Sequence, residues 1–211
     1  MPSAVASAVS VGFYGKLPAR GDFVQAGLSR DFTDPWHAWL QTVIAGSRTI
    51  MGESWLPAFL EAPVWRFALT DGLCGKSCVL GLMLPSVDRV GRYFPLTIAA
   101  LATHPLFDEA SADAWLDQCE TIGRLALDED APPERLTALL SAADAPGEAL
   151  PRRGSVWWSE GGPRVPAGRF TLGTLPDSTG FAGMLGAGHE TAAASGTINS
   201  EESAAAATEE R

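Results

Sequence analysis

Charged side chains gather in two stretches that are also rich in Gly, Pro and aromatic residues. These stretches span residues 12–36 and 85–95, and neither shows helical or strand periodicity. A solvated linker does not need aromatic residues and a core does not need charge, so structured loops of this composition are typical of recognition or catalysis. The candidate residues for a partner-binding surface are Lys16, Arg20, Asp22, Ser86, Asp88, Arg89 and Arg92, with Trp36 as a possible anchor or support.

The ionisable residues of these stretches allow two chemical interpretations. Asp22 and Asp88 can pair with nearby Arg side chains and pin the two loops together, because Arg binds a carboxylate in a bidentate manner. Alternatively, the four cations among the candidate residues outnumber the two carboxylates among them, and the surplus can face the acids or phosphate of a partner. Both interpretations can hold at once.

A phosphate-binding loop is not favoured by the first stretch, although Gly12, Gly15 and Lys16 suggest one. A Walker loop requires a Gly five residues before the second of these glycines and a Ser or Thr after the Lys. Ser10 and Leu17 occupy those positions. The sequence therefore predicts a turn at this point.

Two alternatives to a simple interaction surface remain open. A hydrolase could use Ser86 and Asp88 with His104 as the base, but no Gly-x-Ser-x-Gly elbow surrounds the serine. A phosphopeptide or small-ligand sensor could form on residues 16–22, where it would need converging N–H groups and Arg side chains. The other histidines, His37 and His189, are interpreted as packing or surface residues.

Neither a metal site nor a cofactor site is predicted. Cys74 and Cys78 are four residues apart and no second pair follows, so a zinc site would need ligands from elsewhere. Together with Cys119 they are better interpreted as small buried thiols.

Composition indicates a cytoplasmic globular protein. The chain has 211 residues, of which 46% are hydrophobic, and a formal net charge of −10. This charge argues against nucleic acid as a partner, because phosphate contacts need a basic surface. Three cysteines fit a reducing compartment, and the first 11 residues lack the features of a secretory signal. Membrane insertion is not expected, because no apolar run approaches the ~20 residues that span a bilayer.

The sequence also predicts the helices and strands that must position the two loops. Asp34 and Pro35 predict a helix start, followed by an apolar stripe from Trp36 to Met51. Residues 65–69 alternate between large apolar and other side chains, which predicts a strand with one buried face. Further strands are expected at residues 11–14, 79–84, 96–101, 155–159 and 169–172, and further helices at 54–60, 113–127, 133–140 and after Asp177.

Strands that follow one another without an intervening helix imply an antiparallel sheet. The predicted fold class is therefore α+β, with a sheet of about five strands, helices packed mainly on one side, and a disordered acidic C-terminal tail. The expected organisation is a flexible N-terminus (1–10), a single domain (11–186), and an Ala- and Glu-rich tail (187–211). We expect both tryptophans of the Trp157–Trp158 pair to be buried.

Five strings in the chain resemble the type VI secretion-associated family called TagF. They lie at residues 12–24, 34–41, 63–69, 85–96 and 155–158, in the family's order, and the resemblance covers about residues 11–185. His37 departs from the pattern, which has Asp in a Pro-Trp-Asp string. The tail from Gly186 onward resembles nothing familiar.

The resemblance implies regulation and no catalysis. Members of the family look like post-translational repressors of type VI secretion that act in the cytoplasm. The implied partner is the forkhead-associated (FHA) scaffold protein of that system. Some relatives are fused to a serine/threonine phosphatase; this chain shows no phosphatase metal motif, so any phosphatase would be a separate protein. The resemblance supplies no catalytic residue.

Overall fold

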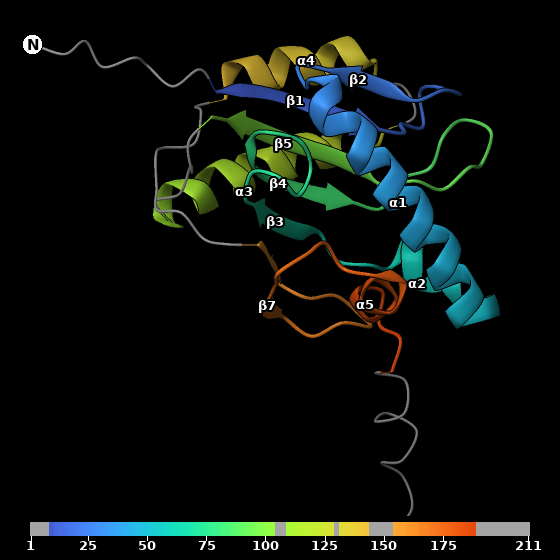
Figure 1. The fold of residues 1–211 in the computed structure, drawn as a ribbon. Helices are drawn as coiled ribbons and strands as arrows, with labels where there is room; N and C mark the ends of the chain where they lie inside the picture. Colours follow the sequence, from blue (N-terminus) through green and yellow to red (C-terminus); the bar gives the residue numbers. More distant parts are fainter. Residues whose placement is uncertain (1–8, 104–108, 129–130, 144–153, 189–211) are drawn as a thin grey trace, which may run out of the picture.

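An antiparallel sheet of seven strands forms the centre of the protein (Figure 1). The computed structural model describes residues 9–103, 109–128, 131–143 and 154–188. The strand order is β2-β1-β5-β4-β3-β6-β7, and every neighbouring pair is antiparallel. The strands are β1 (Ser10–Gly15), β2 (Val24–Ala26), β3 (Trp65–Leu69), β4 (Cys78–Leu84), β5 (Leu96–Ala102), β6 (Ser155–Ser159) and β7 (Gly168–Leu172).

The antiparallel arrangement agrees with the sequence, but the prediction of about five strands was too low. The strand that sequence patterns missed altogether is β2, which has only three residues and pairs with β1 after a loop. A segment this short shows no clear alternation of apolar and polar residues, so its pairing becomes visible only when β1 is in place.

Helices cover both faces of the sheet, so the prediction that they pack mainly on one side was wrong. The helices are α1 (Arg30–Met51), α2 (Trp55–Leu60), α3 (Glu109–Leu125), α4 (Pro133–Ala142) and α5 (Ser178–Met184), with a short 3₁₀ turn at Gly52–Ser54. One apolar cluster joins α1, α2 and α5 to the sheet, and a second joins α3 and α4 to the opposite face (Figure 1). In β4, Val79 and Met83 belong to the first cluster while Leu80, Leu82 and Leu84 belong to the second. Because both faces of this strand are apolar, both need a covering layer.

Helix α1 begins at Arg30, five residues before Pro35, which the sequence predicted as the first helical position. The Thr33 N–H donates to the Ser29 carbonyl at 3.0 Å, so the first turn forms ahead of the proline. Phe32 is buried and stacks on Trp36 with ring centroids 5.4 Å apart. Burial of this ring extends the helix even though Pro35 removes one backbone hydrogen bond.

Strand β3 also departs from its prediction, because both of its faces are buried. Arg66 was expected on a solvated face, yet α3 covers it and leaves the residue 7% exposed. Its guanidinium lies 2.6 Å from Asp117 and 3.1 Å from Glu120, both on α3. These carboxylates make a charged residue compatible with a covered strand.

The tryptophan pair of β6 divides between core and periphery. Trp157 is fully buried, as expected. Trp158 was expected to be buried too but is only half-buried, and the Arg169 guanidinium lies 5.4 Å from its ring centroid.

The predicted cap of α5 is present, because the Asp177 carboxylate accepts the Gly180 N–H at 2.8 Å. Among the described residues, no helix is both long enough and apolar enough to cross a membrane.

Candidate functional site: two paired loops

The two charged stretches form neighbouring loops at one end of the sheet. Loop 1 (residues 16–23) joins β1 to β2, and loop 2 (residues 85–95) joins β4 to β5. Because β1 pairs with β5, loop 1 leaves the sheet beside the point where loop 2 enters it. At that point Gly15 has a φ of 146°, and a Cβ there would lie 2.2 Å from the Pro95 carbonyl oxygen. Only glycine allows the two backbones to approach this closely.

The loops run side by side over most of their length. The Arg89 N–H donates to the Arg20 carbonyl at 3.0 Å, and the Arg92 guanidinium donates to the Gly21 carbonyl. Further along, Phe23 and Phe94 make an edge-to-face contact with centroids 4.8 Å apart. These contacts follow the same order in both loops, so the loops form a single ridge.

Asp88 is the charge centre that holds the ridge together. One carboxylate oxygen accepts the N–H groups of Val90 and Arg92 at 3.0 and 2.9 Å, and the other accepts Arg92 Nε at 2.7 Å. The second oxygen also forms a buried ion pair with Lys16 of loop 1. Burial by itself raises the pKa of the Asp88 carboxyl, but the hydrogen bonds from Lys16, Arg92 and Val90 outweigh it and hold the pKa well below its usual range.

Ser86 contributes to the same framework. It is buried, and its hydroxyl donates to the Lys16 carbonyl at 2.7 Å, while its own carbonyl accepts the Phe94 N–H at 3.1 Å. The hydrogen-bonded partner of its hydroxyl is therefore a backbone oxygen. Within the described ranges no histidine hydrogen-bonds to Ser86, and His104 lies outside them.

An aromatic cluster that the sequence did not predict joins Phe23 and Phe94 of the ridge to Tyr14 of β1 and His37 of α1. Tyr14 stacks on Phe23 at 5.6 Å, and both rings also contact His37 and Phe94. The Tyr14 hydroxyl is hydrogen-bonded to His37 Nδ1. Burial and the negative charge of Asp34 raise the pKa of Tyr14 to about 12. The four aromatic residues of the cluster come from four separate segments of the chain, so their contacts could not be predicted from spacing. The aromatic content of the two stretches was the one signal in the sequence.

Trp36 lies in the core on the face of the sheet that α1 covers. It has no exposed surface, its ring packs 4.7 Å from Phe67, and its Nε1–H donates to Thr97 Oγ1 at 2.9 Å. A partner at the surface cannot touch it. This burial argues against the role of anchor that the sequence suggested for Trp36.

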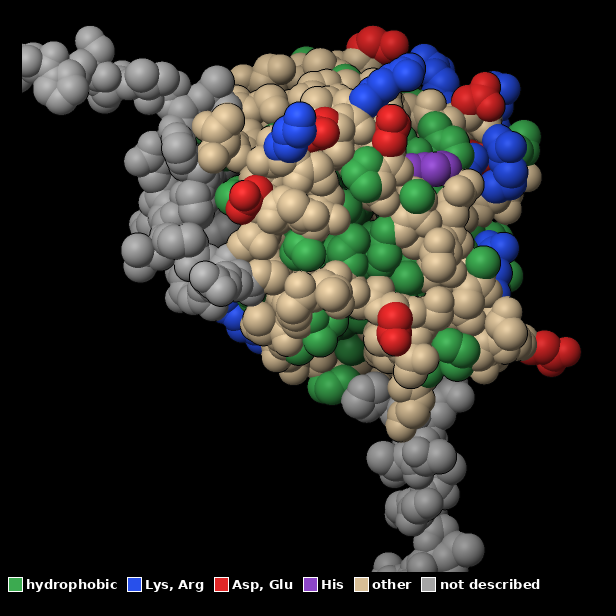
Figure 2. All heavy atoms as spheres, in the orientation of Figure 1, with side chains coloured by type: hydrophobic (Ala, Val, Ile, Leu, Met, Phe, Trp, Pro, Cys, Tyr) green, Lys and Arg blue, Asp and Glu red, His purple; other side chains and the backbone are tan. Residues whose placement is uncertain are grey.

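The outer side of the ridge carries the remaining charged candidates. Arg20, Asp22 and Arg89 are exposed, and Arg92 is exposed although it binds Asp88. The Asp22 carboxylate lies 4.0 Å from Arg92, and Arg20 lies 3.8 Å from Glu134 of α4. Figure 2 shows a His side chain beside hydrophobic side chains, with Lys and Arg side chains nearby. The geometry therefore separates the candidates into buried residues that pin the loops and exposed residues that a partner could contact.

Asp88 also affects what loop 2 can bind. Its carboxylate already accepts the two backbone N–H groups that converge at the turn, together with the Arg92 side chain. Converging N–H groups of this kind are where a phosphate would dock. In this protein the chain's own carboxylate takes that position.

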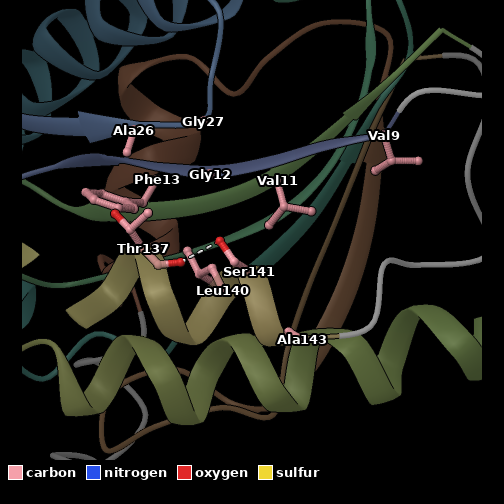
Figure 3. Close-up of a pocket in the computed structure, with 10 residues that line it drawn as sticks. All are labelled: Val9, Val11, Gly12, Phe13, Ala26, Gly27, Thr137, Leu140, Ser141 and Ala143. Atoms are coloured by element: carbon pink, nitrogen blue, oxygen red, sulfur yellow. Dashed lines mark hydrogen bonds between the residues drawn. The ribbon is translucent and has the colours of Figure 1, made fainter. Parts of the chain in front are cut away.

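A hollow of about 300 Å³ lies away from the ridge, between the β1–β2 edge and α4 (Figure 3). Its lining is mainly apolar or backbone, and the Ser141 hydroxyl at its wall donates to the Thr137 carbonyl at 2.9 Å. None of the predicted site residues lines it. The lining residues are Val9, Val11, Gly12, Phe13, Ala26, Gly27, Thr137, Leu140, Ser141 and Ala143.

The cysteines are buried and unpaired, as the sequence predicted. Burial raises the pKa of the Cys74 and Cys119 thiols to about 12. No group of three or more metal-binding side chains occurs in the part of the chain that the structure describes.

The sequence also matches the model of a family associated with type VI secretion. A family described as "TagF N-terminal domain, Type VI secretion system-associated" matches residues 12–143, a range that contains both loops. The chain belongs to the TagF family. No curated protein matches the chain in sequence.

A solved structure is also similar over most of the chain. It is the crystal structure of PA0076 from Pseudomonas aeruginosa PAO1, with 35% sequence identity and a TM-score of 0.76. The similarity covers 83% of this chain and 94% of that one.

Proposed function

We propose that this protein is a non-enzymatic, post-translational repressor of type VI secretion system assembly, which acts in the cytoplasm by binding the FHA scaffold protein. Membership of the TagF family supports the link to type VI secretion. The observation that carries the mode of action is the ridge itself, in which buried charges hold two loops rigidly and exposed charges point outward.

The chemistry of the ridge supports binding over catalysis. Ser86 is buried and its hydroxyl is bonded to a backbone carbonyl, which does not suit a nucleophile. Asp88 fills the anion position of loop 2, and it also pairs with the buried Lys16 of loop 1, so neither group is free to bind a phosphate. Exposed side chains on a rigid support instead suit a protein interface, because little conformational freedom is lost on binding.

The first test is calorimetry of the full chain with the FHA scaffold protein. We expect saturable binding by the wild type. In bacteria with a fluorescent sheath protein, we expect overproduction of the wild-type chain to reduce the number of assembled sheaths. Absence of binding would make the scaffold the wrong partner, and binding without loss of sheaths would separate the interaction from repression.

A further inference from the structure

We infer that the outer side of the ridge binds an acidic protein segment that carries an exposed hydrophobic side chain. The inference rests on the proposed function, because it assigns the surface and the chemistry of the partner to the same two loops. The contact residues would be Arg20, Arg89, Phe23 and Val90. Lys16, Asp88 and Arg92 would hold those residues in place.

The ridge is already ordered before any partner arrives. The Lys16–Asp88 ion pair and the Arg92 contacts to Asp88 and the Gly21 carbonyl tie the loops to one another. The turn from Asp88 is closed by the Gly91 N–H, which donates to the Asp88 carbonyl at 2.9 Å. A preformed surface of this kind loses little entropy on binding, so modest contacts suffice for affinity.

The charge of the ridge is opposite to that of the whole chain. The formal net charge of the protein is −10, yet the two loops hold four cations against two carboxylates. The Arg89 side chain has no carboxylate partner among the described residues, and Arg20 has only a distant contact of 3.8 Å with the exposed Glu134. Exposed pairs at such distances contribute little. An acidic segment would therefore be repelled by most of the protein and attracted to this ridge, which orients its approach.

Two hydrophobic side chains lie exposed on the same ridge. Val90 is 65% exposed at the turn next to Arg89, and Phe23 is 42% exposed at the base. Phe23 is held in place by its contacts with Tyr14 and Phe94 and by the Lys16 ammonium, 4.5 Å from its ring centroid. Rigid apolar side chains flanked by arginines are typical of interface anchors. The partner segment should accordingly offer both carboxylates and an apolar side chain.

A peptide titration tests this chemistry without the scaffold protein. The probe is a short synthetic peptide with one leucine flanked by glutamates, added at millimolar concentration to the ¹⁵N-labelled full chain. The matched probe has lysines in place of the glutamates. We expect the glutamate peptide alone to shift the amide signals of residues 20–23 and 88–92. Shifts by both peptides equally, shifts elsewhere, or no shifts on the ridge would overturn the inference.

Variants tested against the FHA scaffold protein then separate this inference from the proposed function. We expect the Arg20→Glu/Arg89→Glu double variant and the Val90→Ser variant each to weaken binding by about tenfold or more. Lys76→Glu is the matched control, because this exposed lysine precedes β4 whereas loop 2 follows it, at the opposite end of the strand.

The outcomes of the two experiments differ for the two proposals. Tight binding by the wild type and by both ridge variants would overturn the inference and leave the scaffold as the partner. Loss of affinity in Lys76→Glu equal to that in the ridge variants would also overturn it, because the effect would not be local. Failure of the wild type to bind the scaffold would contradict the proposed function, and the peptide titration would still decide the inference.

Discussion

Asp88 has more hydrogen-bond donors around it than its neighbours in the ridge, and each loop depends on it. Lys16 reaches it from loop 1, while Arg92 and two backbone N–H groups reach it from loop 2. The sequence allowed either pinning of the loops or a surplus of cations. At the residue scale both descriptions apply, since Asp88 is buried in the pinning contacts while Arg89 remains outside them.

Replacing Asp88 by Asn should destabilise the protein markedly. The amide keeps the shape of the side chain but leaves the buried Lys16 ammonium without a counter-charge. Removal of one partner from a buried ion pair typically costs about 3–5 kcal/mol in the free energy of unfolding. Urea unfolding of the wild type and the variant measures this loss. Arg89→Glu is the control and should unfold like the wild type, because its side chain has no ion pair among the described residues; a loss below about 1 kcal/mol in Asp88→Asn would contradict the pinning role.

The same carboxylate should make stability depend on acid pH. The pKa of Asp88 is lowered in the folded state, whereas an unfolded Asp titrates near about 3.9. The stabilisation is therefore complete above the unfolded pKa and is lost as the pH falls through the folded one. We expect the free energy of unfolding to fall more steeply below about pH 4 in the wild type than in Asp88→Asn. Parallel curves for the two proteins would show that Asp88 has no role in acid sensitivity.

At the scale of elements, the start of α1 depends on the loop between β3 and β4. Pro35 cannot donate to the Asp31 carbonyl, which therefore lacks its normal helical partner. Gly75 packs against this carbonyl, and the Lys76 N–H donates to the Asp31 carboxylate at 2.7 Å. A segment more than 40 residues away thus covers the weakest turn of the helix.

A pair of glycine substitutions in that loop tests this contact. Gly72 and Gly75 both have a φ of 86°, so alanine is strained at either position by about 1–2 kcal/mol. A Cβ at Gly75 would lie 2.4 Å from the Asp31 carbonyl oxygen, whereas one at Gly72 would meet nothing within 4 Å. We expect Gly75→Ala to lower the free energy of unfolding by at least about 2 kcal/mol more than Gly72→Ala. Equal losses in urea unfolding would mean that the loop yields without disturbing α1.

At the scale of the whole molecule, the two apolar clusters on either side of the sheet make the layers interdependent. Strands β4 and β5 contribute side chains to both clusters, so neither helical layer can be removed without exposing apolar surface. The hydrophobic drive to cover both faces outweighs the local preferences of single segments. The rigidity of the ridge follows from this, since β1, β4 and β5, which carry its loops, lie within the covered sheet.

The tail provides a prediction at this scale. Composition predicts that residues 187–211 stay outside the domain, and the members of the two clusters among the described residues all precede Gly186. Deletion of residues 189–211 should therefore change the melting temperature by less than about 2 °C. Calorimetric melting of both proteins checks this. A larger decrease would show that the tail contributes to the fold, and the proposed boundary at residue 186 would then be wrong.

Local patterns in the sequence determined several elements correctly. The strands at residues 65–69, 79–84 and 96–101, the antiparallel arrangement, the buried thiols and the Asp177 cap all follow from spacing, propensity or capping chemistry within a few residues. The TagF family was also evident from the sequence, because five strings occur in the family's order, and the family match confirms it. These features need no knowledge of distant contacts.

Only the tertiary structure determined which residues far apart in the sequence bury or pair with one another. The covering of both sheet faces, the burial of Arg66 by carboxylates of α3, and the early start of α1 depend on contacts between remote segments. The same holds for the ridge. Its charged residues were predicted from the sequence, but which of them are buried in ion pairs and which are exposed depends on the tertiary structure. The contact between Phe23 and Phe94 beside them was likewise not predictable. The physical reason is that burial and ion pairing are determined by neighbours in space, and the Lys16–Asp88 pair, for example, joins residues 72 positions apart along the chain.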